Sequence, residues 1–304
     1  MTRTVAVTGA SGFLGRHVCQ VLARRGHQVI GIGHQSSEPP ADLREVVADW
    51  TAWDMTKPGT PPVPTRASAI VHLAQSPRFR EFPAGARDMF DVNLRSTFEL
   101  LEAARLSGIA RFVYVSSGAV YGESGERRAP AEQPILGRPD LGFYAMTKLA
   151  SELFAKTYDS LLFVSILRLF FPYGPGQQAD RLLPRLIQNV AARQPLKLQG
   201  EHGLTFNPIY VSDAAEAVAR AVDAEGAVTL DIAGRESVSL RQLGEMIGKA
   251  VRQAPLFEVN RDQASPTLLG DSPTMSERLE FTPVVGLTEG IARTAADLLA
   301  QSPA

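Results

Sequence analysis

A glycine-rich turn near the N-terminus, Thr8–Gly15 with the sequence TGASGFLG, constrains the fold of this chain more than any other stretch. It follows the apolar run Val5–Val7 and leads into Arg16–Ala23, which has the residues of a helix. Glycine lets the main chain bend sharply and approach an anion, and a helix N-terminus directs backbone N–H groups at a phosphate. The order of strand, turn and helix therefore predicts a dinucleotide lying across the edge of a parallel sheet.

Apolar runs alternate with helical segments along the first half of the chain. The predicted strands are Val5–Val7, Gln28–Gly33, Val46–Trp50, Ser68–Ala74, Arg111–Ser116 and Leu162–Leu167. The predicted helices are Arg16–Ala23, Arg87–Ser107 and Phe143–Tyr158. This alternation is typical of a parallel sheet with helices on both faces. The predicted fold is therefore α/β, a Rossmann-type doubly wound parallel sheet with a smaller C-terminal α/β substrate-binding domain.

The domain boundary is predicted where this alternation ends. From residue 172 onward prolines, glycines and short helices replace the regular pattern. We predict a dinucleotide-binding domain over residues 1–171, to which residues 204–234 return, and a substrate-binding domain over residues 172–203 and 235–304. At 304 residues the chain is long enough for one large unit and a smaller one.

The composition excludes several classes of protein. Lysine and arginine total 31 against 32 acidic residues, so no basic surface for nucleic acid or an anionic membrane is expected. Cys19 is the only cysteine, which excludes an internal disulfide and a cysteine-rich metal site, and no metal site is predicted. There is no signal segment before the first strand, and the longest apolar stretch, Leu161–Phe171, is too short to span a bilayer. We therefore expect a cytoplasmic protein that acts on a small molecule.

The end of the second predicted strand bears on the choice of cofactor. An acidic residue there would bond the ribose 2′-hydroxyl of NAD and repel the 2′-phosphate of NADP. This chain has Gly33-His34-Gln35-Ser36-Ser37, with no carboxylate and several donors. We predict a preference for NADP(H), with His34, Ser36 or Ser37 near the 2′-phosphate. The alternative is NAD(H) held through other contacts.

Two more strand ends are predicted to reach the cofactor. Asp49 and Trp50 end the third predicted strand, where the carboxylate would meet the adenine amino group. Leu73, Ala74 and Gln75 end the next strand and should lie at the rim of the cofactor site. His72, inside that apolar strand, is interpreted as a core residue with satisfied ring nitrogens.

Two later motifs have the residues for hydride-transfer chemistry. Ser117 ends a predicted strand, and Tyr144 and Lys148 open a helix. Their spacing of four puts Tyr144 and Lys148 on one helix face. An unperturbed phenol titrates at about 10, and a neighbouring ammonium lowers that value, so Tyr144 is the predicted proton donor and acceptor. Lys148 would also hold the nicotinamide ribose, and Ser117 would hydrogen-bond the same substrate oxygen as Tyr144.

The chain resembles the extended short-chain dehydrogenases/reductases of the NAD-dependent epimerase/dehydratase family, which act mostly on nucleotide sugars. The matching positions are Thr8, Gly9, Gly12, Gly15, His72-Leu73-Ala74, Asn93, Ser117, Val120-Tyr121-Gly122, Tyr144, Lys148, Arg168, Tyr173-Gly174-Pro175-Gly176, Tyr210-Val211, Asp213, Leu279, Phe281 and Pro283. The resemblance implies that Ser117, Tyr144 and Lys148 form the catalytic set and that Asn93 braces the helix behind Lys148. It also implies a homodimer built through the helices Arg87–Ser107 and Phe143–Tyr158.

The full set of predicted cofactor contacts combines the motifs and the resemblance. It comprises Gly9, Ser11, Gly12, Phe13, Leu14, Gly15, His34, Ser36, Asp49, Trp50, Leu73, Ala74, Gln75, Asn93, Ser116, Tyr144, Lys148 and Phe171. The predicted substrate contacts are Ser76, Arg78, Ser117, Phe171, Arg181 and Phe206.

Departures from the family pattern narrow the expected reaction. Family 4,6-dehydratases have an Asp-Glu pair after the catalytic hydroxyl, whereas this chain has Gly118-Ala119. The 3,5-epimerising reductases use a cysteine and a histidine, and Cys19 is in the wrong place for that chemistry. Hydride transfer at one carbon remains, as in a 4-ketoreductase or a 4-epimerase. Many 4-epimerases carry the acidic ribose residue that is missing here, so the sequence favours an NADPH-dependent 4-ketoreductase of a keto-deoxysugar nucleotide.

The substrate side departs from the family as well. Phe171 and Phe206 replace an asparagine and an arginine that commonly contact the nucleotide diphosphate. Either other cations bind the diphosphate, among them Arg78, Arg80, Arg181 and Arg185, or the substrate is a non-sugar carbonyl compound. A cofactor-binding protein without enzymatic activity is a further alternative, but binding alone does not require the set of Ser117, Tyr144 and Lys148.

Overall fold

The computed structural model describes residues 2–34, 38–122, 135 and 141–300. These residues form two compact units. The first lies within Met1–Gly122, Pro134–Arg168 and Ala215–Leu230, and the second within Leu169–Ala214 and Asp231–Ala304. The first unit therefore ends slightly earlier than predicted. Its returning segment is Ala215–Leu230, which is shorter at both ends than the predicted 204–234.

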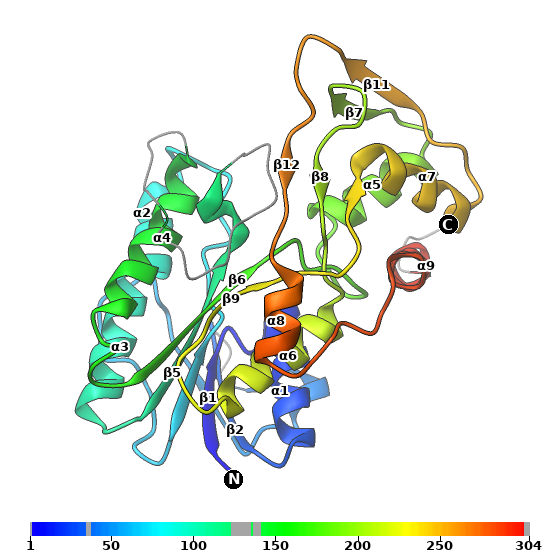
Figure 1. The fold of residues 1–304 in the computed structure, drawn as a ribbon. Helices are drawn as coiled ribbons and strands as arrows, with labels where there is room; N and C mark the ends of the chain where they lie inside the picture. Colours follow the sequence, from blue (N-terminus) through cyan, green and yellow to red (C-terminus); the bar gives the residue numbers. More distant parts are fainter. Residues whose placement is uncertain (1, 35–37, 123–134, 136–140, 301–304) are drawn as a thin grey trace. The chain divides into compact units, whose positions relative to one another are not determined.

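The central element is a seven-stranded sheet with the order β3-β2-β1-β4-β5-β6-β9 (Figure 1). Its strands are β1 (Thr4–Thr8), β2 (Gln28–Gly33), β3 (Asp49–Ala52), β4 (Ala69–His72), β5 (Arg111–Ser117), β6 (Phe163–Leu169) and β9 (Thr229–Ile232). The strands β1 to β5 pair in parallel. This architecture confirms the predicted doubly wound α/β fold. Five of the seven strands are close to their predicted ranges, β3 begins three residues later than predicted, and β9 was foreseen only as part of the returning segment.

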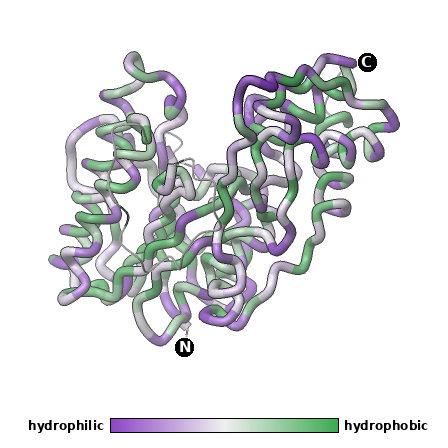
Figure 2. Tube along the Cα trace, turned by 45° about the horizontal axis from the view of Figure 1, so that its top comes forward, coloured by the Kyte–Doolittle hydropathy of each residue, from purple (hydrophilic) through white to green (hydrophobic). Residues whose placement is uncertain are grey.

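Helices cover both faces of this sheet. They are α1 (Phe13–Arg24), the short η1 (Ala41–Leu43), α2 (Ala86–Met89), η2 (Phe90–Arg95), α3 (Ser96–Leu106), η3 (Gly118–Tyr121), α4 (Gly142–Lys156) and α6 (Val211–Asp223). In Figure 1, α2, α3 and α4 lie together on one side of the sheet. Hydrophobic and hydrophilic residues alternate along the helices, as expected for helices with one apolar face (Figure 2).

One buried cluster joins the sheet to α3 and α4. Its members come from alternate strand positions and from the helices facing them: Ala6, Ile32, Trp53, Met55, Ala67, Ile70, Val92, Leu100, Leu101, Ala104, Ile109, Phe112, Tyr114, Ala155, Leu162, Val164 and Ile166. Since side chains alternate across a strand, Ile32 faces this cluster while its neighbours Gly31 and Gly33 face the other side.

The second unit has two small sheets. One has the order β10-β8-β12, from β10 (Val238–Ser239), β8 (Thr205–Phe206) and β12 (Thr267–Leu268). The other pairs β11 (Phe257–Asn260) with β7 (Leu196–Gln199) in parallel. Its helices are α5 (Leu182–Ala191), α7 (Leu240–Val251), α8 (Ser272–Arg278) and α9 (Leu287–Ala300).

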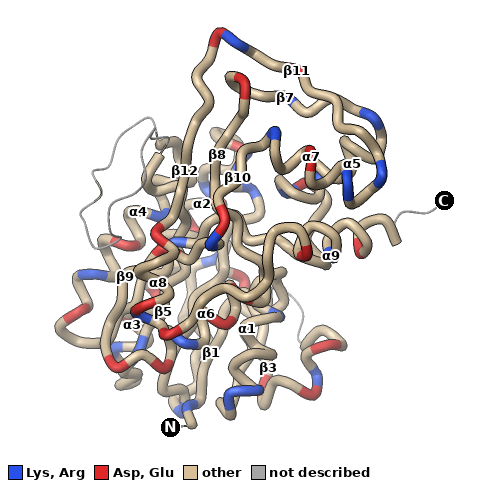
Figure 3. The backbone as a smooth tube through the Cα atoms, turned by 45° about the vertical axis from the view of Figure 1, so that its right-hand side comes forward, with Lys and Arg blue, Asp and Glu red and all other residues tan. Residues whose placement is uncertain are grey.

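Charged residues of both signs are interspersed along the elements (Figure 3). Among the described residues, no helix is both long and apolar enough to cross a membrane.

Candidate active site

The glycine turn is shaped for a close approach of backbone to an anion. Gly9 has a φ of +67°, and a Cβ there would lie 2.9 Å from the amide nitrogen of Ala74. Helix α1 begins directly after Gly12, which offers no side-chain cap, and its first turn contains no acidic residue. The first N–H groups of α1 are therefore open to a negatively charged group. These features fit the pyrophosphate of a dinucleotide, as predicted for the residues from Gly9 to Gly15.

Strand β2 brings its end to the same edge of the sheet. Ile32 pairs with Thr8, the last residue of β1, and the carbonyl of Ile32 accepts a hydrogen bond from Ala10 at 3.4 Å. Gly33 and the exposed His34 follow, while Ser36 and Ser37 lie outside the described residues. Arg16, on the first turn of α1, is paired with Asp42 at 3.0 Å.

The strand pairing corrects the predicted position of Asp49. Asp49 begins β3 and is opposite Ile30, so it is not at the strand's carboxyl end, where ligands bind in such sheets. It is exposed and bonded to Arg66, whose guanidinium, together with the amide of Trp50, lowers its pKa. The carboxylate that follows the end of β3 is Asp54, which sequence reasoning missed. A hydrogen bond from the Thr56 hydroxyl, and to a smaller extent one from Lys57, lowers the pKa of Asp54 to about 2.

His72, at the end of β4, is a core residue. Its Nδ1 lies 2.7 Å from the Thr8 hydroxyl and its Nε2 lies 3.0 Å from the Thr97 hydroxyl. Burial, and then the charge of Lys148, lowers the pKa of His72 to about 3. The ring is therefore neutral at physiological pH, which agrees with the structural role predicted for it.

The residues after His72 divide into exposed and buried positions. Leu73 and Ala74 are half-buried beside the glycine turn, and Gln75 is exposed. Ser76, a predicted substrate contact, is fully buried: its hydroxyl donates to Asp88 and its amide donates to Asn93. The structure favours a structural role for Ser76.

Tyr144 and Lys148 lie one turn apart near the start of α4. The Tyr144 hydroxyl donates to Gln75 Oε1 at 3.1 Å, which brings two predicted site residues together. Lys148 is 1% exposed, and its Nζ donates to the carbonyl of Val115 at 3.0 Å. Burial lowers the pKa of Lys148 to about 8, and the charge of Glu152 partly opposes this shift. At neutral pH Lys148 is therefore mostly protonated beside the Tyr144 turn.

Asn93 braces α4 from the neighbouring helix, as the family resemblance implies. Its Nδ2 donates to the hydroxyl of Thr147 at 3.0 Å. Its carbonyl accepts from the hydroxyls of Thr97 and Ser151, at 2.6 and 2.8 Å. Asn93 lies in the wide π-helical segment η2, a distortion that frees backbone groups and often marks functional sites. Its amide bonds therefore fix the position of α4 beside Lys148.

Ser116 and Ser117 are the last two residues of β5, and they differ in how far they are buried. Ser117 is half-buried, and its Oγ accepts from the amide of Ala119 at 3.2 Å, which starts the short helix η3. Ser116 is 4% exposed, and its Oγ has no hydrogen-bond partner among the described residues. Gly118 and Ala119 carry no acid or base at the positions after Ser117.

A buried ion pair behind the site was not foreseen as such. Arg168 on β6 forms a bidentate pair with Glu152 on α4, at 2.8 and 3.1 Å. Arg168 also donates to the hydroxyl of Tyr121 at 2.8 Å. Since Glu152 is one turn beyond Lys148 and Tyr121 ends η3, this network joins the helix of Lys148 to the segment that follows Ser117.

The second unit contains the two aromatic departures from the family pattern. Phe171 has a φ of +43°, and its ring centroid is 4.6 Å from that of Phe206. Phe206 is 1% exposed, so it packs against Phe171 and presents little surface to a ligand. Of the predicted arginines, Arg78 in the first unit pairs with Glu81, and Arg181 in the second unit donates to Gln178.

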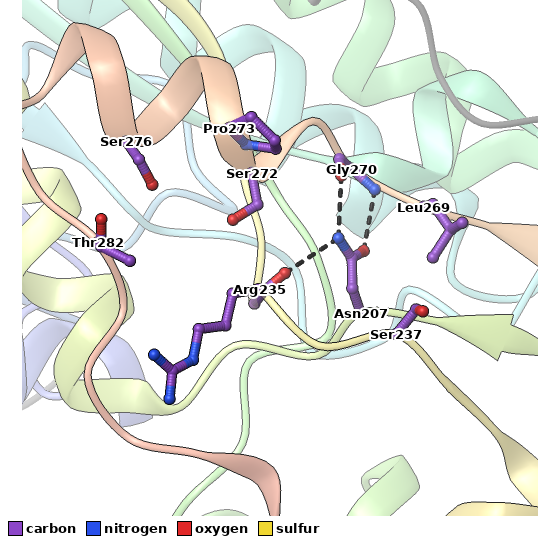
Figure 4. A pocket seen from close by; sticks show the side chains of 10 residues that line it. Asn207, Arg235, Ser237, Leu269, Gly270, Ser272, Pro273, Ser276 and Thr282 are labelled. Carbon is purple, nitrogen blue, oxygen red and sulfur yellow. Dashed lines mark hydrogen bonds between the residues drawn. The ribbon is translucent and has the colours of Figure 1, made fainter.

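A hollow of about 540 Å³ lies within the second unit. Its lining residues are Asn207, Gly234, Arg235, Ser237, Leu269, Gly270, Ser272, Pro273, Ser276 and Thr282. The side chain of Asn207 fixes two of its walls through bonds to Gly234 and Gly270, and the hydroxyls of Ser272 and Ser276 point toward the same space (Figure 4). Hydroxyls beside a guanidinium are groups that bind sugars and anions.

The comparisons with known proteins agree with this geometry. The model of the NAD dependent epimerase/dehydratase family matches residues 5–232. A Bacillus subtilis protein named uncharacterized UDP-glucose epimerase YtcB is 27% identical over 309 residues, covering 94% of this chain and 95% of that protein. A Streptomyces dTDP-4-dehydro-6-deoxy-D-allose reductase is 26% identical over 301 residues, covering 92% of each chain.

A solved structure extends the agreement to three dimensions. The UDP-glucose 4-epimerase of Thermus thermophilus, in complex with NAD, superposes with a TM-score of 0.80 at 25% identity. The superposition covers 98% of this chain and 100% of that one. With a family model that spans most of the chain and a glycine turn that fits a dinucleotide, this protein is an enzyme of the NAD dependent epimerase/dehydratase family.

Proposed function

We propose that this enzyme is a nucleotide-sugar 4-epimerase. The observation that carries the proposal is the set of Ser117, Tyr144 and Lys148 at the carboxyl edge of the sheet, with no acid or base at Gly118 and Ala119. Such a set supports proton and hydride exchange at one carbon but lacks the groups that remove water. Relatives named as epimerases, such as the B. subtilis and T. thermophilus proteins, support the same reaction.

Each residue of the set has a defined task. When bound, the nicotinamide cofactor supplies hydride transfer to and from the sugar carbon. Tyr144 would take the proton from the sugar hydroxyl and return it to the same oxygen, after the keto sugar has turned its opposite face to the hydride. The ammonium of Lys148 stabilises the phenolate form of Tyr144, and Ser117 donates to the substrate oxygen as its charge develops.

A second candidate is an NADPH-dependent 4-ketoreductase of a keto-deoxysugar nucleotide. The observation that favours it is the end of β2 at Gly33, where no carboxylate opposes a 2′-phosphate. The Streptomyces reductase supports this reaction. The fate of the cofactor therefore separates the two candidates: an epimerase regenerates its cofactor in each cycle, whereas a reductase consumes NADPH.

One pair of assays tests the proposal. The enzyme is incubated with UDP-glucose or UDP-glucuronate, and separately with a nucleotide-linked 4-ketosugar and NADPH. A 4-epimer formed with no net change in NAD(P)H absorbance supports the epimerase, whereas stoichiometric loss of NADPH supports the reductase. The absence of both reactions over a panel of nucleotide sugars would contradict the proposal.

The first prediction concerns Tyr144. The change Tyr144→Phe removes only the phenolic oxygen and should lower kcat by about 100-fold or more, because proton transfer is lost. Cofactor binding, followed by protein fluorescence, should be retained. A matched control is Tyr158→Phe, because the Tyr158 hydroxyl donates to Glu102 on α3, away from Ser117 and Lys148 in the sequence. Near-wild-type turnover of Tyr144→Phe would contradict the assignment.

We also infer a homodimer formed through α3 and α4. Large apolar side chains are exposed on these helices, with Phe98 at 47%, Leu153 at 61% and Phe154 at 48%. Exposed apolar side chains gathered on neighbouring helices mark protein contact surfaces. The occupant we propose for this face is a second copy of the chain.

A further inference from the structure

The indole of Trp50 lies flat along the two glycines of β2. A Cβ at Gly33 would stand 3.1 Å from Cε2 of Trp50 and closer still to Cζ2. A Cβ at Gly31 would collide with Cε3 and Cζ3 of the same ring. Because Trp50 pairs with Gly31 across the sheet, its side chain leaves the sheet on the face that these two glycines share. Glycine within a strand is unfavourable in general and marks a close approach of another group, here the indole.

This position is at the cofactor edge of the first unit. Gly33 is the last residue of β2, and the carbonyl of Ile32 beside it bonds to Ala10 in the glycine turn. The side chain at the end of β2 is the one that meets the adenosine ribose in dinucleotide-binding sheets. In this chain that place is filled from the neighbouring strand.

Trp50 is separate from the hydrophobic core between the sheet and α3. The buried cluster on the other face contains Ile32 and Trp53, which is 7% exposed, whereas Trp50 is half-buried. Trp50 therefore keeps part of its surface exposed to solvent. An aromatic ring of this kind offers a flat apolar wall with no formal charge.

We propose that Trp50 is a specificity-determining residue of the cofactor site. Its indole occupies the place of the carboxylate side chain that would otherwise end β2, so the adenosine ribose meets an aromatic wall instead of an anion. A 2′-phosphate then meets no carboxylate from the end of β2, and Asp54, which follows β3, is paired with Lys57 at 3.0 Å. Of the described acids that follow β2, Glu38 is paired with Arg44 at 3.5 Å and Asp42 with Arg16 at 3.0 Å.

The inference rests on the proposed dinucleotide role of the glycine turn but not on the reaction at the sugar. Its test therefore uses adenosine fragments that lack nicotinamide: 2′,5′-ADP, which has the 2′-phosphate, and 5′-AMP, which lacks it. Binding of both is measured by titration calorimetry. The wild-type protein should bind 2′,5′-ADP at least as tightly as 5′-AMP. Preference for 5′-AMP by tenfold or more would overturn the inference, whichever reaction the enzyme proves to catalyse.

A double-mutant cycle tests the steric part. Gly33→Asp alone should lower the melting temperature, because its Cβ meets the indole. Trp50→Ala in the same chain should restore folding, and the double variant should then prefer 5′-AMP by about tenfold or more, because a carboxylate now faces the ribose. If Gly33→Asp alone is as stable as wild type, or if the double variant keeps the wild-type preference, the indole does not hold that place.

Fluorescence gives a second readout, from two variants that each keep one tryptophan. The chain has two tryptophans, Trp50 and Trp53. In Trp53→Phe all tryptophan emission comes from Trp50, and 2′,5′-ADP should change it in a saturable way. In the matched control Trp50→Phe, emission comes from the core residue Trp53 and should change far less. An equal response of the two variants would place the ligand away from the indole.

Discussion

Individual residues show that a motif position can be structural even at the edge of an active site. His72 is at the end of β4, a strand that leads to the cofactor rim, yet both of its ring nitrogens are bonded to threonine hydroxyls. Its pKa of about 3 keeps it neutral and unable to exchange protons near pH 7. Tyr144, whose hydroxyl donates to the exposed Gln75, therefore remains the proposed proton donor and acceptor.

The neutral state of His72 has a consequence for stability against pH. The native pKa is about 3 and the unfolded value is 6.5, so between these values only the unfolded chain binds a proton at this residue. Stability from the buried neutral ring is fully present above pH 6.5 and is lost as the pH falls toward 3. This residue alone should contribute a slope of about 1.4 kcal/mol per pH unit in that window.

Urea unfolding at pH 7, 5 and 4 checks this prediction. His72→Gln should be less stable than wild type at pH 7 but should lose stability less steeply on acidification. The exposed His202 provides the control, because His202→Gln should leave the slope unchanged. Equal slopes in wild type and His72→Gln would show that another group controls acid unfolding.

At the scale of the elements, one buried arginine ties a strand to the end of a helix. Arg111, the first residue of β5, is 4% exposed. Its guanidinium donates to the carbonyls of Ala224 at 2.7 Å and Gly226 at 3.0 Å, and to Ala221 at 3.5 Å. These carbonyls belong to the last turn of α6 and the residues after it, which have no partner within the helix itself.

Arg111→Met should destabilise the first unit by about 2 to 4 kcal/mol, because buried carbonyl groups lose their donors. Arg105→Met is the matched control: Arg105 is exposed and paired with Glu102 on the surface, where an ion pair contributes little to stability. Denaturant unfolding at neutral pH measures both. A loss below about 1 kcal/mol for Arg111→Met would contradict the role given to it.

The local spacing of apolar residues predicted the strands and helices well where the pattern fitted only one kind of element. The range Gln28–Gly33 is predicted and observed as β2, and the predicted helix Arg87–Ser107 corresponds to α2, η2 and α3 together. The π-helical turn at Asn93 was not predicted; the carbonyl of Asn93 there accepts from the hydroxyls of Thr97 and of Ser151, and Ser151 is distant in the sequence. Hydrogen bonds between residues that are far apart in the sequence can be recognised only in the folded chain.

The third strand shows why the sequence alone could not identify every residue at the carboxyl end of the sheet. The apolar run before Asp49 predicted a strand that ends there, but pairing with β2 begins at Asp49 and runs to Ala52. The shift moves Asp49 to the wrong end of the strand and places Asp54 after the right one. It also puts the indole of Trp50 over Gly31 and Gly33, a contact that no spacing rule predicts.

At the scale of the whole molecule, the outer faces of α3 and α4 leave apolar surface uncovered. Phe98, Leu153 and Phe154 are each about half exposed or more, at 47%, 61% and 48%. On a helix with a buried face already packed on the sheet, a second apolar face needs a partner. The second copy that we propose would supply one, since an identical patch on each subunit can form a self-complementary two-fold interface.

Introducing charge at this face should separate the subunits. Leu153→Glu combined with Phe98→Glu places carboxylates where the two copies would meet. The dissociation constant of the dimer should therefore rise by about 100-fold or more. Sedimentation velocity over a concentration series measures the change. Leu256→Glu makes the same kind of substitution at a residue that is 51% exposed in the second unit and should leave the assembly unchanged. Because Ser117, Tyr144 and Lys148 all belong to the first unit of one chain, the separated variant should still bind the cofactor. A wild-type protein that sediments only as a monomer would remove the proposed interface.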